Sequence, residues 1–189
     1  MELPATVGYR LFDTRVGQCG IAWGEQGVLS LLLPDRSPAA TRARLVRRLE
    51  ALGLAAHATE PPEHIVHAIG AIQALLQGEP RDLREIELDM RDVPELARRV
   101  YRAARLISPG ETLTYGEVAR KIGSPGAARA VGRALGQNPF AIIVPCHRVL
   151  AAAGGSGGFS AHGGVRTKWK LLEIEGAAHG GQLSLPVSR

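Results

Sequence analysis

The chain has 189 residues, enough for one ordinary domain with a small one or for two small domains, and a formal net charge of +5. Its two cysteines, Cys19 and Cys146, are far apart, which does not fit a disulfide framework or a thiolate zinc site. No apolar run approaches the ~20 residues that span a bilayer, and the first residues lack the basic segment of a signal peptide. We therefore expect a soluble, cytoplasmic protein that makes no membrane contact.

The charge is divided unevenly along the chain. Residues 1–89 hold 9 basic and 12 acidic residues, a net charge of −3, whereas residues 90–189 hold 14 and 6, a net charge of +8. This difference predicts a domain boundary after Asp89. A basic C-terminal half favours a polyanion as partner, most simply nucleic acid, and a solvated basic face without a partner is the alternative.

The N-terminal half has the pattern of a small sheet covered by helices. Three segments of strand composition, separated by glycine-containing turns, span residues 9–14, 19–23 and 28–33. Helical spacing follows over residues 37–52 and 63–76, so we predict a three-stranded sheet with helices packed against it. His64 and His67 lie on the second helix without a visible third ligand, and we predict no metal site.

The next segment favours a helix-turn-helix. After Pro94 an amphipathic helix is predicted, and Thr114 then opens a short helix through a Thr-x-x-Glu capping box. A second helix is predicted over residues 124–136, with Arg129 and Arg133 on one face among alanines and glycines. A helix with such small side chains can approach a duplex closely, and an ordinary helical hairpin with two solvated arginines is the alternative.

An apolar run over residues 140–144 predicts a buried strand that ends beside a cysteine. Cys146 is followed by His147 and Arg148, whose positive charge can favour a nucleophilic thiolate. Neighbours in an extended segment point to opposite faces, so a direct thiolate and imidazole pair requires a bend, and otherwise a bridging water. A structural buried cysteine is the alternative interpretation.

The last pattern in the sequence is a glycine-rich loop followed by a helix. Residues 151–158 are rich in alanine and glycine, and Phe159 offers a packing or stacking face, although a plain linker fits equally well. A final helix is predicted over residues 167–175, ended by Gly176. Glu175 opposes the helix dipole there, which predicts a partner for its carboxylate elsewhere. Residues 177–189 are predicted to be a mobile tail.

Taken together these segments match one known family in order and spacing. The matching residues are Tyr115, Ala128-Arg129-Ala130-Val131-Gly132, Asn138-Pro139, Ile143-Val144-Pro145-Cys146-His147-Arg148-Val149, Gly158-Phe159-Ser160 and Leu171-Leu172-Glu173-Ile174-Glu175-Gly176. The chain thus closely resembles the O6-alkylguanine-DNA alkyltransferases, also called methylated-DNA-protein-cysteine methyltransferases. A weaker resemblance at Phe12-Asp13-Thr14 extends it over nearly the whole chain. It implies an α/β plus α fold: a ribonuclease H-like N-terminal domain (1–89), a winged helix-turn-helix domain (90–176) and the tail.

The resemblance also implies an activity, direct repair of double-stranded DNA by a monomer without a cofactor. An alkylated guanine is flipped out of the duplex, and Cys146 takes a methyl or other alkyl group from O6, once per molecule. The resemblance does not decide whether an alkyl group on O4 of thymine is also accepted. By resemblance His147 acts through a water, Glu175 orients the imidazole, Asn138 braces the cysteine turn, and Tyr115 rotates the nucleotide and protonates the leaving base.

The remaining implied roles concern binding. The residues expected to bind the substrate base are Tyr115, Val149, Phe159 and Ser160. Those expected to bind DNA are Ser124, Ala128, Arg129, Gly132 and Arg133, with Arg129 filling the place of the flipped nucleotide. Phe159 departs from the tyrosine of many members and removes one hydroxyl.

Two other functions are weighed against this one. A sensor or regulator that binds alkylated DNA without transfer is disfavoured, because Cys146, His147 and Glu175 are all present and no cysteine-rich domain is added. A cysteine hydrolase is disfavoured by the adjacency of cysteine and histidine and by the basic helix-turn-helix.

Overall fold

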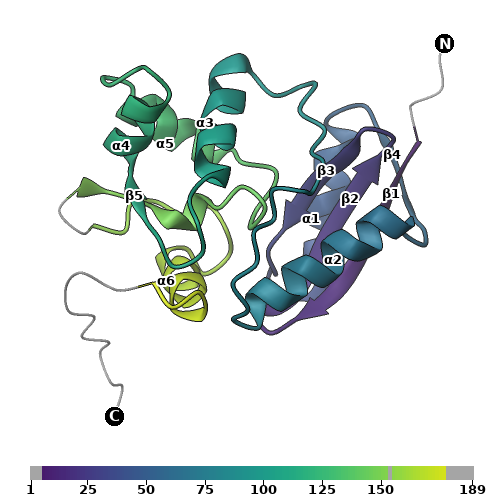
Figure 1. Ribbon diagram of the computed structural model, residues 1–189. Helices are drawn as coiled ribbons and strands as arrows, with labels where there is room; N and C mark the ends of the chain where they lie inside the picture. The colour runs from purple at the N-terminus through teal and green to yellow at the C-terminus, as the bar shows by residue number, and fades with distance from the viewer. Residues whose placement is uncertain (1–5, 153–154, 178–189) are drawn as a thin grey trace.

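The protein was analysed as a computed structural model that describes residues 6–152 and 155–177. Its N-terminal half contains a mixed four-stranded sheet of order β3-β2-β1-β4 (Figure 1). The strands are β1 (Thr6–Thr14), β2 (Gly17–Gly24), β3 (Gly27–Leu32) and β4 (Ala55–Ala58). The antiparallel β1-β2-β3 meander confirms the three predicted strands. The fourth strand, parallel to β1, was not predicted.

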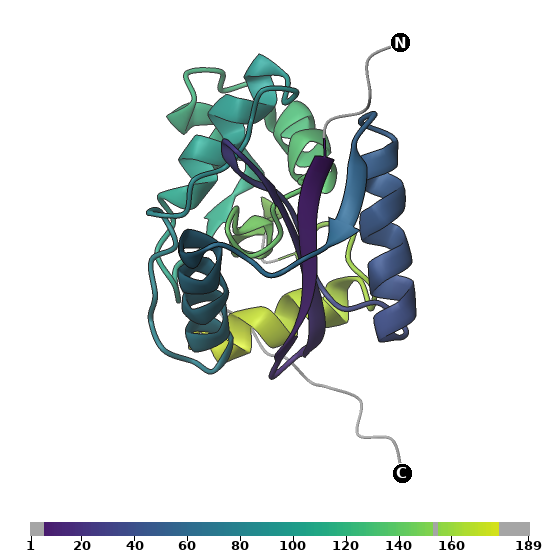
Figure 2. The same cartoon turned by 90° about the vertical axis from the view of Figure 1, so that its right-hand side faces the viewer.

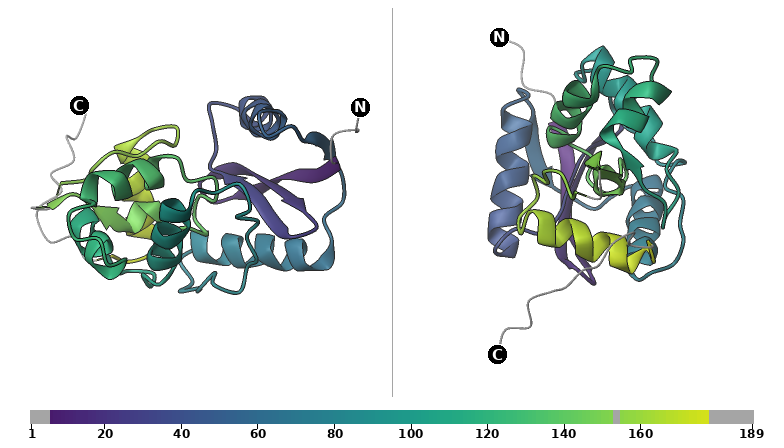
Figure 3. Two further views of the ribbon diagram at one scale, coloured as in Figure 1. Left: turned by 90° about the horizontal axis from the view of Figure 1, so that it is seen from above. Right: turned by 90° about the vertical axis from the view of Figure 1, so that its left-hand side faces the viewer.

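Two helices cover opposite faces of this sheet (Figure 3). They are α1 (Pro38–Glu50) and α2 (Glu63–Leu76), close to the predicted ranges. Ser37 begins α1, because its hydroxyl accepts a hydrogen bond from the Ala40 amide at 3.2 Å. Leu45 and Leu49 of α1 are fully buried on one face, and α2 buries its apolar side on the other. The burial of both sheet faces fixes the register of the strands.

The C-terminal half is mainly helical and lies on the β3 side of the sheet (Figures 1 and 2). Its elements are α3 (Glu95–Arg105), β5 (Leu113–Thr114), α4 (Tyr115–Lys121), α5 (Ala128–Gly136), β6 (Val149–Leu150) and α6 (Val165–Ile174). The predicted capping box is confirmed, since Thr114 and Glu117 exchange side-chain and backbone hydrogen bonds. α5 begins four residues later than predicted, because residues 124–127 form a turn closed by the Ala127 amide and the Ser124 carbonyl at 2.9 Å, and Gly126 disfavours helix.

Edge strand β3 joins the two halves. Its Leu31 amide donates to the Pro139 carbonyl at 2.8 Å, and the Ala141 amide donates to the Leu31 carbonyl at 3.0 Å. The prediction of a strand over residues 140–144 is wrong: Phe140 alone bridges to β3, and the chain then turns at Ile142, where φ is 71°. The turn buries the apolar run as well as a strand would.

The hydrophobic core continues from one half into the other as one buried cluster. Within the described ranges no helix is long and apolar enough to cross a membrane. Of the predicted tail, only Ala177 falls among the described residues; it is buried, and its amide donates to the Leu172 carbonyl at 3.0 Å. The prediction for residues 178–189 lies outside the described residues.

Candidate active site

A compact turn after α5 presents Cys146. The Asn138 side chain spans this turn, donating to the Val144 carbonyl and accepting from the Phe140 amide, both at 2.9 Å. Two tight three-residue turns follow, closed by Ile143 N–H to Ala141 at 2.8 Å and by Cys146 N–H to Val144 at 2.8 Å. The chain thereby reverses and enters a single 3-10 turn, Cys146–Arg148. Because the segment is not extended, the geometric objection to a joint role of Cys146 and His147 is removed.

Behind the cysteine lies a buried network of charged side chains. The Nε2 of His147 is 2.8 Å from Oε1 of Glu175, and the two side chains are 1% and 3% exposed. Arg148 donates from Nε to Oε2 of Glu175 at 2.8 Å and from a terminal nitrogen to Oε1 at 2.9 Å. Another Arg148 nitrogen donates to the Ile107 carbonyl. Glu175 therefore has the partners that its position at the helix end predicts.

These contacts set the protonation states. Burial would raise the pKa of Glu175, but the hydrogen bonds and charges of His147 and Arg148 outweigh it and lower the pKa to about 2. Burial lowers the pKa of His147 despite the carboxylate, so the imidazole is neutral at pH 7. A neutral imidazole whose Nε2–H bonds to Glu175 leaves its Nδ1 unprotonated. That Nδ1 is buried and has no hydrogen-bond partner among the described residues, so it can accept a proton.

The thiol of Cys146 is a weak acid at rest. Burial raises its pKa, while the Asn138 side chain, the Lys168 charge and the amides of the 3-10 turn act in the opposite direction. Proton removal by a nearby base is therefore needed to produce the nucleophile. The same groups that oppose burial are those that stabilise the thiolate once it forms.

Tyr115 and Lys168 lie close to each other, and both interact electrostatically with the cysteine. Burial raises the pKa of the Tyr115 phenol, with a smaller contribution from the Cys146 thiolate, so the hydroxyl is a proton donor at neutral pH. The Lys168 ammonium lies 5.8 Å from the Tyr115 ring centroid and donates to the Val149 carbonyl at 2.6 Å. Burial lowers the pKa of Lys168 to about 8. Gly157, at φ +65°, leaves room for the Tyr115 hydroxyl, because a Cβ there would lie 2.6 Å from it.

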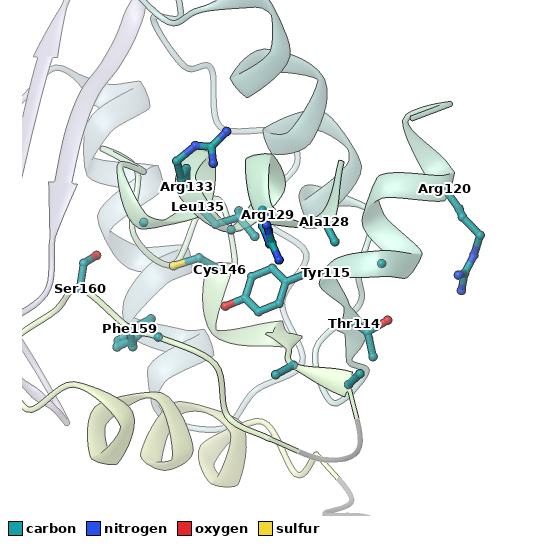
Figure 4. Close-up of a pocket in the computed structure, with 16 residues that line it drawn as sticks. Thr114, Tyr115, Arg120, Ala128, Arg129, Arg133, Leu135, Cys146, Phe159 and Ser160 are labelled. Carbon is teal, nitrogen blue, oxygen red and sulfur yellow. The ribbon is translucent and has the colours of Figure 1, made fainter. Parts of the chain in front are cut away.

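A cavity of about 980 Å³ opens in front of the cysteine, between α4, α5 and the loop after β6 (Figure 4). Of the predicted site residues, it is lined by Tyr115, Ala128, Arg129, Gly132, Arg133, Cys146, Phe159 and Ser160. The two arginines are exposed at its rim on α5, and Gly132 leaves the ring of Tyr115 in ordinary contact distance. A planar base and the adjoining backbone of a nucleic acid fit such a cavity with a cationic rim.

The other predicted residues lie outside this cavity. Asn138, His147 and Glu175 form the layer behind the cysteine, and Val149 is fully buried, with its carbonyl accepting from Lys168. A carbonyl oxygen has a second lone pair, so this bond does not prevent contact with a base. Ser124 lies in the turn before α5 and does not line the cavity.

Two residues of the site were missed by sequence reasoning. Arg148 was noted only for its charge, yet it is 5% exposed and fixes Glu175. Lys168 is fully buried, although lysine is rarely found in a core. Its spacing of three and four residues from Leu171 and Leu172 placed it on the buried face of a helix, which was the available signal.

Comparison with known proteins gives one consistent result. The family model described as "6-O-methylguanine DNA methyltransferase, DNA binding domain" matches residues 95–177. The chain is 43% identical over 169 residues to a methylated-DNA–protein-cysteine methyltransferase of Mycolicibacterium paratuberculosis, covering 89% of this chain and 92% of that protein. It is 35% identical to the protein of the same name from Methanothermobacter thermautotrophicus, covering 86% and 82%.

Solved structures agree with these relatives. The crystal structure of the Mycobacterium tuberculosis O6-methylguanine methyltransferase superposes with a TM-score of 0.69 at 35% identity, covering 90% of this chain and 93% of that one. A structure titled as Mycobacterium tuberculosis OGT in complex with DNA gives a TM-score of 0.67 at 36% identity, covering 89% and 92%. The mixed sheet and the helices described above are therefore those of this fold.

Proposed function

Because the chain belongs to the methylated-DNA–protein-cysteine methyltransferase family, we propose that Cys146 is the residue that receives the alkyl group. The protein repairs DNA directly by taking a methyl or other alkyl group from O6 of guanine, and it is consumed in the reaction. The observation that carries the assignment is that Cys146 lines the large cavity while its neighbour His147 is hydrogen-bonded at 2.8 Å to the buried Glu175. No cofactor is required for this reaction.

The first step is removal of the thiol proton. His147 accepts it at Nδ1 through a water, since this nitrogen is unprotonated and unpartnered among the described residues. Glu175 holds the imidazole by its other nitrogen and stabilises the positive charge that the imidazole gains. Arg148 keeps Glu175 ionised and fixed, so the carboxylate does not take the proton itself.

The second step is an in-line displacement at the alkyl carbon. The thiolate of Cys146 forms the S–C bond as the C–O6 bond breaks, and the electron pair of that bond moves onto the guanine. Tyr115 donates its proton to the departing base, so the guanine does not leave as a poor anionic leaving group. The proton that the imidazole took from the thiol makes up for the one that Tyr115 loses. The thioether product is not hydrolysed, so each molecule reacts once. Val149, Phe159 and Ser160 contact the base.

Binding to DNA is assigned to α5 and the turn before it. The C-terminal half carries a net charge of +8, which suits a polyanion. The small residues Ala128 and Gly132 let α5 approach the groove, and Arg129 fills the place of the flipped nucleotide. Arg129→Ala should then slow repair of duplex DNA more than reaction with free O6-benzylguanine. Equal losses would contradict this role.

We further assign residues 1–89 to a ribonuclease H-like domain and residues 90–176 to a winged helix-turn-helix domain. The order β3-β2-β1-β4 with a parallel β4 and a helix on each face supports the first. The α4–α5 pair beside the β5-β6 ladder supports the second. A DNA-repair role supports a cytoplasmic location, associated with the nucleoid if the source is bacterial.

The test is mass spectrometry after mixing the protein with a duplex that carries one O6-methylguanine. One added methyl should appear on the tryptic peptide 134–148, which contains Cys146, with guanine restored in the DNA. Cys19, on peptide 16–36, is an internal control, because burial raises its pKa to about 11. Tight binding of the lesion with an unmodified Cys146 would instead identify a sensor, and neither binding nor transfer would overturn the proposal.

A further inference from the structure

A second cavity, of about 220 Å³, lies between the two halves of the protein and reaches the same cysteine. Cys146, Phe159 and Ser160 line both cavities. Figure 4 shows the sulfur of Cys146 pointing toward the side on which Ser160 lies, away from Tyr115 and Arg129. The smaller cavity therefore adjoins the reactive atom and continues from it toward β3 and α1, whose residues do not line the larger cavity.

The walls of the smaller cavity combine apolar residues with polar ones, which include Gln137, Asn138 and two arginines of α1. The apolar part comes from the end of β3, from the cysteine turn and from the loop after β6. The Arg44 guanidinium is neutralised by Asp35, 3.1 Å away, and also donates to the Leu33 carbonyl at 2.8 Å. Its Nε and that of Arg48 are both buried without a hydrogen-bond partner.

Arg48 is the unusual member of this pair. Among the described residues no hydrogen bond or ion pair satisfies its guanidinium, although the side chain is half-buried. Burial lowers the pKa of Arg48; Tyr101 acts against this effect, and the neighbouring Arg44 adds to it. A desolvated charge without a counter-ion is costly, and an anion in the cavity would recover that cost.

The chemistry of the reaction indicates which anion can enter. In an in-line displacement the attacked carbon lies between O6 and the sulfur, so any further atoms of the substituent must extend sideways. The smaller cavity exceeds by far the ~10–15 Å³ that admits one water, so it has room for a substituent of several heavy atoms. A substituent that carries a carboxylate would bring its charge toward Arg48.

We propose that the cavity beside Cys146 receives the O6 substituent and that Arg48 makes the protein favour carboxyalkyl groups over neutral groups of the same shape. This inference rests on the proposed function and deepens it by naming a substrate class. The reaction is unchanged: the S–C bond forms, the C–O6 bond breaks, and the product is a carboxyalkyl thioether whose carboxylate pairs with Arg48.

The test compares substrates that differ only in charge. Duplexes carrying O6-carboxymethylguanine or O6-(3-carboxypropyl)guanine are each paired with the corresponding carboxamide, and single-turnover rates are measured for wild type and Arg48→Gln. The rate ratio of acid to amide cancels intrinsic differences between the two variants. We expect Arg48→Gln to lower this ratio about tenfold for at least one chain length. The exposed neighbour on the same helix, Arg47, provides the control Arg47→Gln, which should leave the ratio unchanged.

O6-methylguanine separates the possible failures. Arg48→Gln should repair it within about twofold of the wild-type rate, which also establishes that the variant is folded. An unchanged acid-to-amide ratio at both chain lengths would overturn the inference and leave the proposed function intact. Equal slowing of the acid, amide and methyl substrates would overturn it in favour of a contact between Arg48 and DNA phosphate. Failure of wild type to accept methyl would overturn the proposed function, and this inference with it.

Discussion

Replacing Glu175 by glutamine tests the buried network most directly. The carboxylate accepts three hydrogen bonds, from His147 at 2.8 Å and from two nitrogens of Arg148 at 2.8 and 2.9 Å. Glutamine keeps the shape but removes the charge, and it leaves the Arg148 side chain, which is 6% exposed, without a counter-ion. Glu175→Gln should therefore destabilise the fold as well as slow alkyl transfer.

The size of the effect follows from two independent arguments. The pKa of Glu175 falls from its ordinary 4.5 to about 2, because the contacts to His147 and Arg148 outweigh the opposing effect of burial. At ~1.4 kcal/mol per tenfold change in equilibrium, this is a stabilisation of roughly 3 kcal/mol at neutral pH. Removing one partner of a buried ion pair costs about 3–5 kcal/mol, which agrees. At ~2–4 °C per kcal/mol, the Tm should fall by about 10 °C.

The pH dependence gives the control on this reasoning. The folded pKa lies below the unfolded one, so the stabilisation is complete above about pH 4.5 and is lost as the pH falls toward 2. In urea unfolding, the free energy of unfolding of Glu175→Gln should be lower than that of wild type at pH 7, and this difference should shrink below pH 4.5. Glu173→Gln, at an exposed position of the same helix, should cost less than about 0.5 kcal/mol. An equal difference in unfolding free energy between the two proteins at pH 7 and at pH 3 would refute the ion-pair account.

Two further substitutions probe the groups around the cysteine. Gly157→Ala forces a Cβ to within 2.6 Å of the Tyr115 hydroxyl and strains a φ of +65°, so the rate of alkyl transfer should fall at least tenfold. The control is Gly158→Ala, which should retain activity because the space around its Cβ is open. Equal rates for the two alanine variants would show that Tyr115 moves without cost. Lys168→Met removes a charge that lowers the pKa of the Cys146 thiol, so the pH profile of iodoacetamide alkylation should shift to higher pH, and a shift to lower pH would contradict this electrostatic role.

The sequence predicted correctly the caps and turns, which depend on residues close together in the chain. The capping box at Thr114, the start of a helix at Ser37 and the turns of the β1-β2-β3 meander were all predicted, because each depends on residues within a few positions of one another. β4 was missed because its sequence, Ala55-Ala56-His57-Ala58, has no β-branched residue, and its pairing with β1 is non-local.

The cysteine turn was mispredicted for a related reason. An apolar run of five residues does not distinguish a buried strand from a buried turn, since both remove the side chains from water. The outcome depends on Asn138, whose two hydrogen bonds close the turn, and on the pairing of Pro139 and Ala141 with β3. The resemblance to a known family located Asn138 and Glu175, but composition and periodicity alone left the alternatives open.

The N-terminal half does more than support the reactive half, because the geometry of the cysteine turn depends on it. Ile142 adopts a φ of 71°, which is unusual for a β-branched residue and costs of the order of 1–3 kcal/mol. Such strain persists only where the surroundings fix it, and here β3 holds the start of the turn through two backbone hydrogen bonds at Leu31. The position of the Cys146 sulfur is thus set by a strand more than a hundred residues earlier in the chain. The same contact brings α1, with Arg48, to the cavity in which we propose that the alkyl substituent lies, so that on this proposal one interface both shapes the nucleophile and selects its substrate.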